Sequence, residues 1–167
     1  GEIKNIIENE GVVIKTRGCL VQGIIGVGGE KNGELFFLDD DKSSNYSGKI
    51  LVIKGSIDKN RYDFLSNNGA LGVVAGGFDY ESLSDILGYR LGVAITGTEN
   101  ISTTLVITEG FGDVEMSNKT YELLKKHNTF NASINGATQI RAGVIRPEVI
   151  VPSVNKKESI KNFDEND

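Results

Sequence analysis

Short β-branched runs separated by glycine-rich or polar turns fill the first 38 residues. None of these runs has the spacing of apolar residues that is typical of a helix. The dipeptide Asn32-Gly33 is typical of a tight hairpin turn, because both of its residues readily adopt positive φ angles. We therefore expect a small antiparallel β-meander, or a partly closed barrel, whose strands lie at 2–7, 12–16, 20–26 and 34–38.

The pattern changes after a polar run at residues 39–47, which reads Asp-Asp-Asp-Lys-Ser-Ser-Asn-Tyr-Ser. We expect this run to be a linker between two domains. The apolar run Ile50–Ile53 that follows predicts a strand buried on both faces. Further strands are expected at 71–75, 91–96 and 103–108, and strand and turn at 133–151.

Two longer helices and one short helix are expected among these strands. Ser56 is the expected N-cap of a helix over residues 57–67, in which Ile57, Phe64 and Leu65 form one apolar stripe, and Gly69 is its expected C-cap. Ser117 is the expected N-cap of a helix over residues 118–126, and the short helix ends at Leu87.

These elements predict a mixed α/β fold with three parts and a tail. The expected organisation is a β-meander subdomain at 1–38, a linker at 39–47 and an α/β domain with a largely parallel sheet at 48–152. Residues 153–167 contain a single pair of large apolar side chains, so we expect a mobile tail there.

The segment Gly48–Ala75 resembles the swivelling β/β/α domains, and the protease-associated domain in particular. It reads Gly-Lys-Ile-Leu-Val-Ile-Lys-Gly, then a helix, then Asn-Gly-Ala-Leu-Gly-Val-Val-Ala. The resemblance covers roughly residues 47–98, and its glycines let helix and strand pack closely. It carries no catalytic residue, and it implies a binding or regulatory module.

A second resemblance spans more of the chain. The segments Gly18–Gly23, Gly110–Gly112 with Met116, and Arg146–Pro152 are similar to segments of a family of uncharacterised bacterial proteins. This resemblance implies no activity. Cys19 stands where that family is expected to have a small residue, which argues against a catalytic thiol.

Composition and charge limit the classes of function. A net charge of −5 without a basic run disfavours nucleic-acid binding, and no apolar run approaches the ~20 residues that span a bilayer. The single cysteine and single histidine exclude an internal disulfide, a cysteine-based zinc site and a multi-histidine metal site within one chain. We predict no cofactor and a cytoplasmic location, and since the chain begins with Gly1, a preceding segment stays an open alternative.

Two arginines and a glycine turn suggest a site for a small anion. Arg141 and Arg146 could together hold a phosphate or a carboxylate if Gly143 forms a bulge; the alternative is a structural pair between arginine and Glu148. Gly110, Phe111 and Gly112 follow a strand and could form a backbone nest at a helix N-terminus, or an ordinary connection in which Phe111 fills the core. The full candidate site is Gln22, Gly110, Phe111, Gly112, Arg141, Arg146 and Glu148.

Other motifs carry weaker signals. The glycines of residues 23–29 lack the helix and the Lys-Ser/Thr pair of a phosphate loop, and the acidic run at 39–41 lacks the spaced oxygen ligands of a Ca²⁺ or Mg²⁺ loop. His127 lies at a helix end, where positive charge is favoured, and a Cys19–His127 dyad is the remaining alternative.

The sequence supports two hypotheses. The first is a non-enzymatic binding, assembly or regulatory domain of a longer chain, which binds a protein partner or self-associates. The second is a site for a small-molecule anion between the two subdomains. This site could also belong to an enzyme, although no catalytic residue is assigned.

Overall fold

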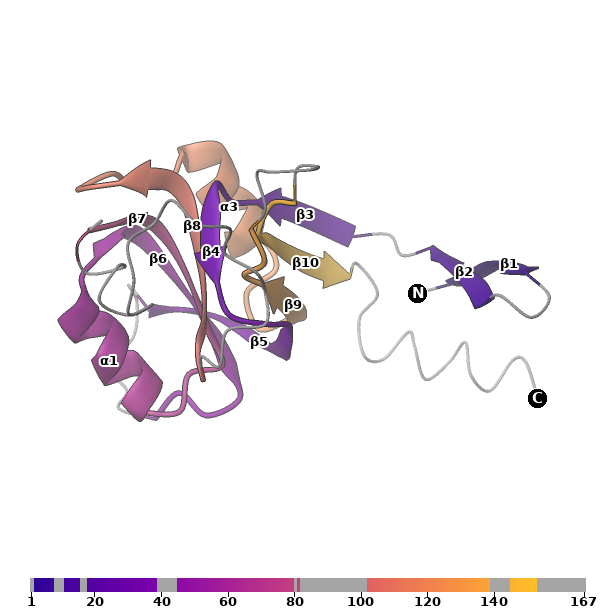
Figure 1. Ribbon diagram of the computed structural model, residues 1–167, viewed down its shortest axis with the longest axis horizontal. Helices are drawn as coiled ribbons and strands as arrows, with labels where there is room; N and C mark the ends of the chain where they lie inside the picture. The colour runs from indigo at the N-terminus through magenta and orange to yellow at the C-terminus, as the bar shows by residue number, and fades with distance from the viewer. Residues whose placement is uncertain are drawn as a thin grey trace.

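The computed structural model describes residues 2–7, 11–15, 18–38, 45–79, 81, 102–138 and 145–152. The predicted strand at 91–96, most of the predicted linker and the predicted tail lie outside these residues. The described part has a mixed α/β fold (Figure 1). Its elements are β1 (Glu2–Ile7), β2 (Gly11–Lys15), β3 (Gly18–Gln22), β4 (Ile25–Val27), β5 (Lys31–Phe37), β6 (Lys49–Ile57), α1 (Lys59–Asn67), β7 (Gly72–Phe78), β8 (Thr104–Phe111), α3 (Asn118–Lys125), β9 (Asn131–Asn135) and β10 (Glu148–Pro152).

The ten described strands form two sheets. β1 and β2 pair with each other in a two-stranded antiparallel sheet, and the other strands form an eight-stranded sheet in the order β3-β10-β9-β5-β6-β7-β8-β4. The successive pairs from β5 to β8 are parallel, and the remaining pairs are antiparallel. The expected parallel arrangement is therefore confirmed for the centre of the sheet.

The expected meander at 1–38 is not confirmed beyond the β1–β2 pair. β3, β4 and β5 pair with later strands of the chain and not with one another. The predicted hairpin turn at Asn32-Gly33 is wrong, since both residues lie inside β5 opposite Ser133 and Ala132 of β9. A Cβ atom on Gly33 would lie 2.7 Å from the Gly48 carbonyl oxygen, so close backbone packing accounts for this glycine without a turn.

A bent segment joins the two ends of the eight-stranded sheet. β3 and β4 stand at opposite ends of the strand order, yet only Gly23 and Ile24 separate them. The Gly23 N–H donates to the Pro147 carbonyl (2.8 Å), and the Ile24 N–H donates to the Ile107 carbonyl (2.9 Å). The segment 18–27 is thus bonded to β10 on one side and to β8 on the other, which closes the sheet on itself.

Two apolar cores follow from this closure. One core receives side chains from β3, β5, β6, β7, β8, β9, β10 and α3, as expected for the inside of a curled sheet. The other core lies on the opposite face of β6, β7 and β8, where Tyr62 and Leu65 of α1 pack. In Figure 1, α1 and α3 accordingly cover different sides of the sheet.

The boundaries of α1 differ from the prediction. Pairing between β6 and β7 continues to Ile57 opposite Phe78, which keeps Ser56 in the strand. Asp58 is the N-cap, and its carboxylate accepts the Arg61 N–H at 2.9 Å. The predicted stripe is also partly wrong, because Phe64 is 53% exposed while Tyr62 and Leu65 are buried.

Two predicted helix termini are confirmed. α1 ends at Asn67 as predicted, but its C-cap is Asn68; Gly69 is the next residue, with a φ of +92° that favours glycine. Ser117 caps α3, and its hydroxyl accepts the Thr120 N–H at 3.3 Å. Local capping signals therefore located α3 and the end of α1, whereas sheet pairing decided where α1 begins.

We expect Gly136→Ala to lower the free energy of unfolding by about 1–3 kcal/mol, because overpacking of a close contact costs this much. A Cβ atom at this position would lie 2.1 Å from the Val27 carbonyl oxygen, at the closure of the sheet. Gly55→Ala is the matched control, since its Cβ would meet nothing within 4 Å. Urea unfolding of both variants checks this expectation, and equal losses of stability would contradict it.

Candidate functional site

Four of the seven candidate residues come together near the end of β3. Gln22 lies directly opposite Glu148 in the β3–β10 pairing. The bond from the Gly23 N–H to the Pro147 carbonyl brings the backbone next to Arg146 to the same place. Gly110 joins them, because a Cβ atom on Gly110 would lie 3.4 Å from the Cδ1 atom of Ile24. Arg141 lies outside the described residues.

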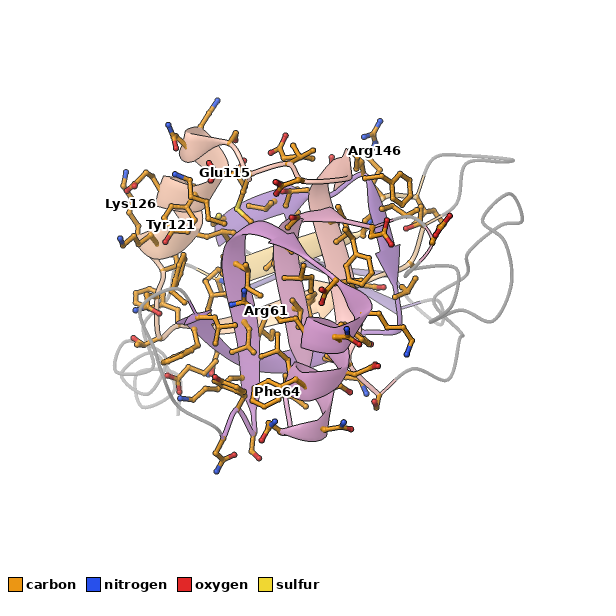
Figure 2. All side chains as sticks on the ribbon, turned by 90° about the vertical axis from the view of Figure 1, so that its left-hand side faces the viewer. Arg61, Phe64, Glu115, Tyr121, Lys126 and Arg146 are labelled. Atoms are coloured by element: carbon orange, nitrogen blue, oxygen red, sulfur yellow. The ribbon has the colours of Figure 1, made fainter. Side chains whose placement is uncertain are left out.

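The charges around this meeting point are mixed. Gln22 and Arg146 are exposed and Glu148 is half-buried, and Figure 2 shows Arg146 at the margin of the molecule. Within the described residues no ion pair involves Arg146, so the predicted structural pair between Arg146 and Glu148 is not formed. A bound anion would therefore meet one guanidinium and the nearby Glu148 carboxylate, whose repulsion weakens the attraction.

The glycines at 110–112 do not lead directly into a helix. Gly110 and Phe111 belong to β8, where they pair with Gly77 and Phe78. Gly112, with a φ of +97°, begins a loop, and α3 starts only at Asn118. Phe111 is 41% exposed and so does not fill the core. The expected nest at a helix N-terminus is thus replaced by the side-chain cap from Ser117.

This loop crosses the carboxyl ends of the parallel strands. The Gly112 N–H donates to the Phe78 carbonyl (3.0 Å), and the Met116 N–H donates to the Lys54 carbonyl (2.6 Å). A Cβ atom on Gly76 would lie only 2.4 Å from the Met116 nitrogen, so the loop lies directly against β7. In open α/β sheets ligands bind at this edge, and here residues 112–116 occupy part of it.

The single histidine and the single cysteine are both engaged in structural contacts. The Nδ1 atom of His127 lies 2.9 Å from the Leu123 carbonyl oxygen, and its ring packs edge-to-face on Phe130 with centroids 5.5 Å apart. Cys19 is buried in the core inside the curled sheet, and burial raises the pKa of its thiol. Because a raised pKa leaves less thiolate at neutral pH, this environment opposes a nucleophilic role for Cys19.

One charged cluster was not foreseen from the sequence. The Nζ atoms of Lys54 and Lys125 lie 5.4 Å and 5.6 Å from the centroid of the Tyr121 ring, which also packs edge-to-face on Phe37. Tyr121 and Lys125 are four residues apart in a helix, and this spacing could have indicated the contact between them. Lys54 comes from β6, and no local spacing connects it with Tyr121. Cation–π attraction accounts for both lysines without a ligand.

The described residues were also compared with the requirements for a metal site and a membrane span. Among them, no group of three or more His, Cys, Asp or Glu side chains is placed to hold a metal ion. The acidic run at 39–41 lies outside this part of the chain. No helix within the described ranges is long and apolar enough to cross a membrane.

Comparisons with known proteins give no match. No protein-family model matches the chain, and neither a curated protein nor a solved structure is significantly similar to it. The two family resemblances therefore stay predictions from the sequence, and the arguments for function rest on the geometry.

We expect Cys19 to react slowly with a thiol reagent in the folded protein. Burial raises the pKa of the Cys19 thiol above that of an exposed cysteine, so the thiolate fraction at pH 8 is lower in the folded state than in the unfolded state. Labelling rates in buffer and in urea measure the difference, which should exceed about tenfold for a buried thiol with a raised pKa. Equal rates would mean that Cys19 is accessible and reactive.

Proposed function

We propose that the chain is a non-enzymatic binding or assembly domain, with a regulatory role in a longer protein. The observation that carries this proposal is the separate two-stranded sheet of β1 and β2. It lies apart from the eight-stranded sheet, beyond the start of β3 (Figure 1). Among the described residues, no backbone hydrogen bond joins it to the rest of the molecule.

A two-stranded sheet of this kind is a poor structural unit by itself. An isolated hairpin is marginally stable in water, and independent stability requires at least one further strand or a packed element. No other described strand pairs with the outer edge of β1 or of β2, and an unpaired edge is a template for pairing with another chain. A partner that covers this hairpin would satisfy both requirements, and this favours binding or assembly over catalysis.

The finer architecture forms part of the same proposal. The unit β6–α1–β7 corresponds to the segment that resembles swivelling β/β/α domains, so we propose a domain of that type. Because β3–β5 share one sheet with β6–β10, this proposal places the division of the chain between β2 and β3 instead of at residues 39–47. The cytoplasmic location predicted from the sequence is kept within this proposal.

A small anion site is the second candidate. It is favoured by the convergence of Gln22, Gly110 and Arg146 at the end of β3. It is opposed by the Glu148 carboxylate opposite Gln22. An attraction that depends on one exposed arginine is weak, because solvent screens exposed charges.

A thermal-shift titration with phosphates, nucleotides, carboxylates and divalent metals separates the two candidates. For the binding-domain proposal we expect no shift with any of them. A ligand at 100 times its Kd would instead add ~2.7 kcal/mol, which raises the melting temperature of a chain of this size by roughly 5–10 °C.

The controls for this titration are two arginine variants. Arg146→Ala removes the candidate ligand, and Arg61→Ala removes an exposed arginine on α1, away from Arg146 (Figure 2). A shift that disappears only in Arg146→Ala would establish the anion site and contradict the expectation of no shift.

The binding-domain proposal also predicts complexes of the chain with itself or with a protein partner. We expect native mass spectrometry, over a wide range of concentrations and after mixing with a cell extract, to detect masses above that of the monomer. The result that would contradict the proposal is a strict monomer that also forms no cross-link to another protein.

A further inference from the structure

Residues 112–115 form a strap that crosses the carboxyl end of β7 with its side chains exposed. Asp113, Val114 and Glu115 all belong to the exposed surface, and Figure 2 shows Glu115 near the margin of the molecule. The next residue, Met116, is only 2% exposed, and its side chain packs in the core inside the curled sheet. The strap therefore buries little apolar surface, whereas the residue that follows it is anchored.

Beneath the strap, β7 has two consecutive glycines. Gly76 and Gly77 are both buried. A Cβ atom on Gly77 would overlap the Gly112 carbonyl oxygen and would lie 3.1 Å from the backbone nitrogen and oxygen of Val114. A glycine inside a strand often marks the close approach of a ligand or of another backbone. Here the backbone that approaches Gly77 is the strap.

The strands around these glycines are irregular at the same level. The register between β6 and β7 shifts between Ile53 and Ser56, and the register between β7 and β8 shifts between Ala75 and Gly77. β-Bulges are frequent next to functional sites, and ligands of open α/β sheets bind beyond the carboxyl ends of the strands. The strap thus covers a place where sheets of this kind commonly bind a ligand.

Exposed hydrogen bonds fasten the strap to the strands. The Gly112 N–H donates to the Phe78 carbonyl (3.0 Å), and the Ser56 hydroxyl donates to the Asp113 carboxylate (2.9 Å). Segments with few buried apolar contacts and with exposed hydrogen bonds open locally without global unfolding. Gly112 also has a φ of +97°, so the strap begins at a residue with the backbone freedom of a hinge.

We propose that residues 112–115 are a hinged strap, which moves away from β7 while Met116 stays in place and thereby uncovers the main chain at Gly76 and Gly77. In the closed form the strap blocks this surface, so the contact is autoinhibitory. The two glycines present no side chains, and the surface accordingly suits an extended main chain such as that of the strap. This inference goes beyond the proposed binding role of the β1–β2 sheet, because it concerns a different place in the molecule.

Hydrogen exchange of the folded chain, followed by NMR at low urea concentrations, tests whether the strap opens. The Gly112 amide reports on the strap. The Met116 amide, bonded to the Lys54 carbonyl (2.6 Å), reports on the anchor, and the Thr104 amide, bonded to the Leu71 carbonyl (3.1 Å), reports on the other end of β8. We expect Gly112 to exchange at least about tenfold faster than the other two and independently of urea, because local opening exposes little surface. Equal rates with one common urea dependence would overturn the proposal.

Ser56→Ala removes the hydroxyl that holds Asp113. Gly112 should then exchange about fivefold faster, which corresponds to the loss of one ordinary hydrogen bond, while Met116 keeps its rate. Ser133→Ala is the matched control, since its hydroxyl donates to the Glu30 carboxylate (3.2 Å), also at an exposed position. If Ser56→Ala leaves the Gly112 rate unchanged, the end of β8 merely frays and the strap is not a unit.

Gly77→Ala tests the same contact from the side of β7. The three atoms nearest to the new Cβ all belong to the strap, so the substitution should favour the open form. We expect Gly112 to exchange at least about fivefold faster, because opening relieves the overpacking, and Met116 to stay protected. Gly55→Ala is the control, since its Cβ would meet nothing within 4 Å. Equal acceleration at Gly112, Met116 and Thr104 would mean that the strap is an integral part of the core.

Discussion

The hydrogen bonds on the two sides of segment 18–27 hold this fold in its closed form. On one side β3 and Gly23 bond to β10 and Pro147, and on the other side Ile24 and β4 bond to β8. Because both ends of the strand order meet in one bent segment, the inward faces of seven strands share a single core. Without this segment the sheet would open and the apolar residues that line its interior would be exposed to water, which is unfavourable because apolar burial is the dominant favourable term in folding.

The closure also explains which parts of the fold could be predicted from the sequence. The apolar run Ile50–Ile53, the cap at Ser117 and the end of α1 before Gly69 are local signals, and the structure confirms each of them. The partners of β3, β4 and β5 are set by contacts between residues far apart in the chain, so the nearest-neighbour meander was the wrong interpretation. The prediction of a turn at Gly33 failed for the same reason. Gly33 allows close packing on Gly48, and a single sequence does not distinguish such a glycine from one in a turn.

The candidate site shows the same division between local and distant signals. Gln22, Gly110 and Arg146 belong to separate sequence motifs, and the closure of the sheet brings them together. The position of Glu148 opposite Gln22 was not predictable, because it depends on the register of two strands 126 positions apart. That register places Glu148 opposite Gln22, two residues after Arg146, which is the described arginine of the site. The loop at 112–116 adds a second obstacle, since its backbone lies against β7 where a ligand would otherwise bind.

These constraints leave the hairpin as the part of the molecule whose geometry is least explained by the fold itself. The eight-stranded sheet closes through segment 18–27, whose two parts pair with β10 and β8. Within the part of the chain that the structure describes, no strand pairs with either outer edge of the β1–β2 sheet. Unpaired strand edges are templates for pairing with a further strand, and this supports the proposed binding or assembly role.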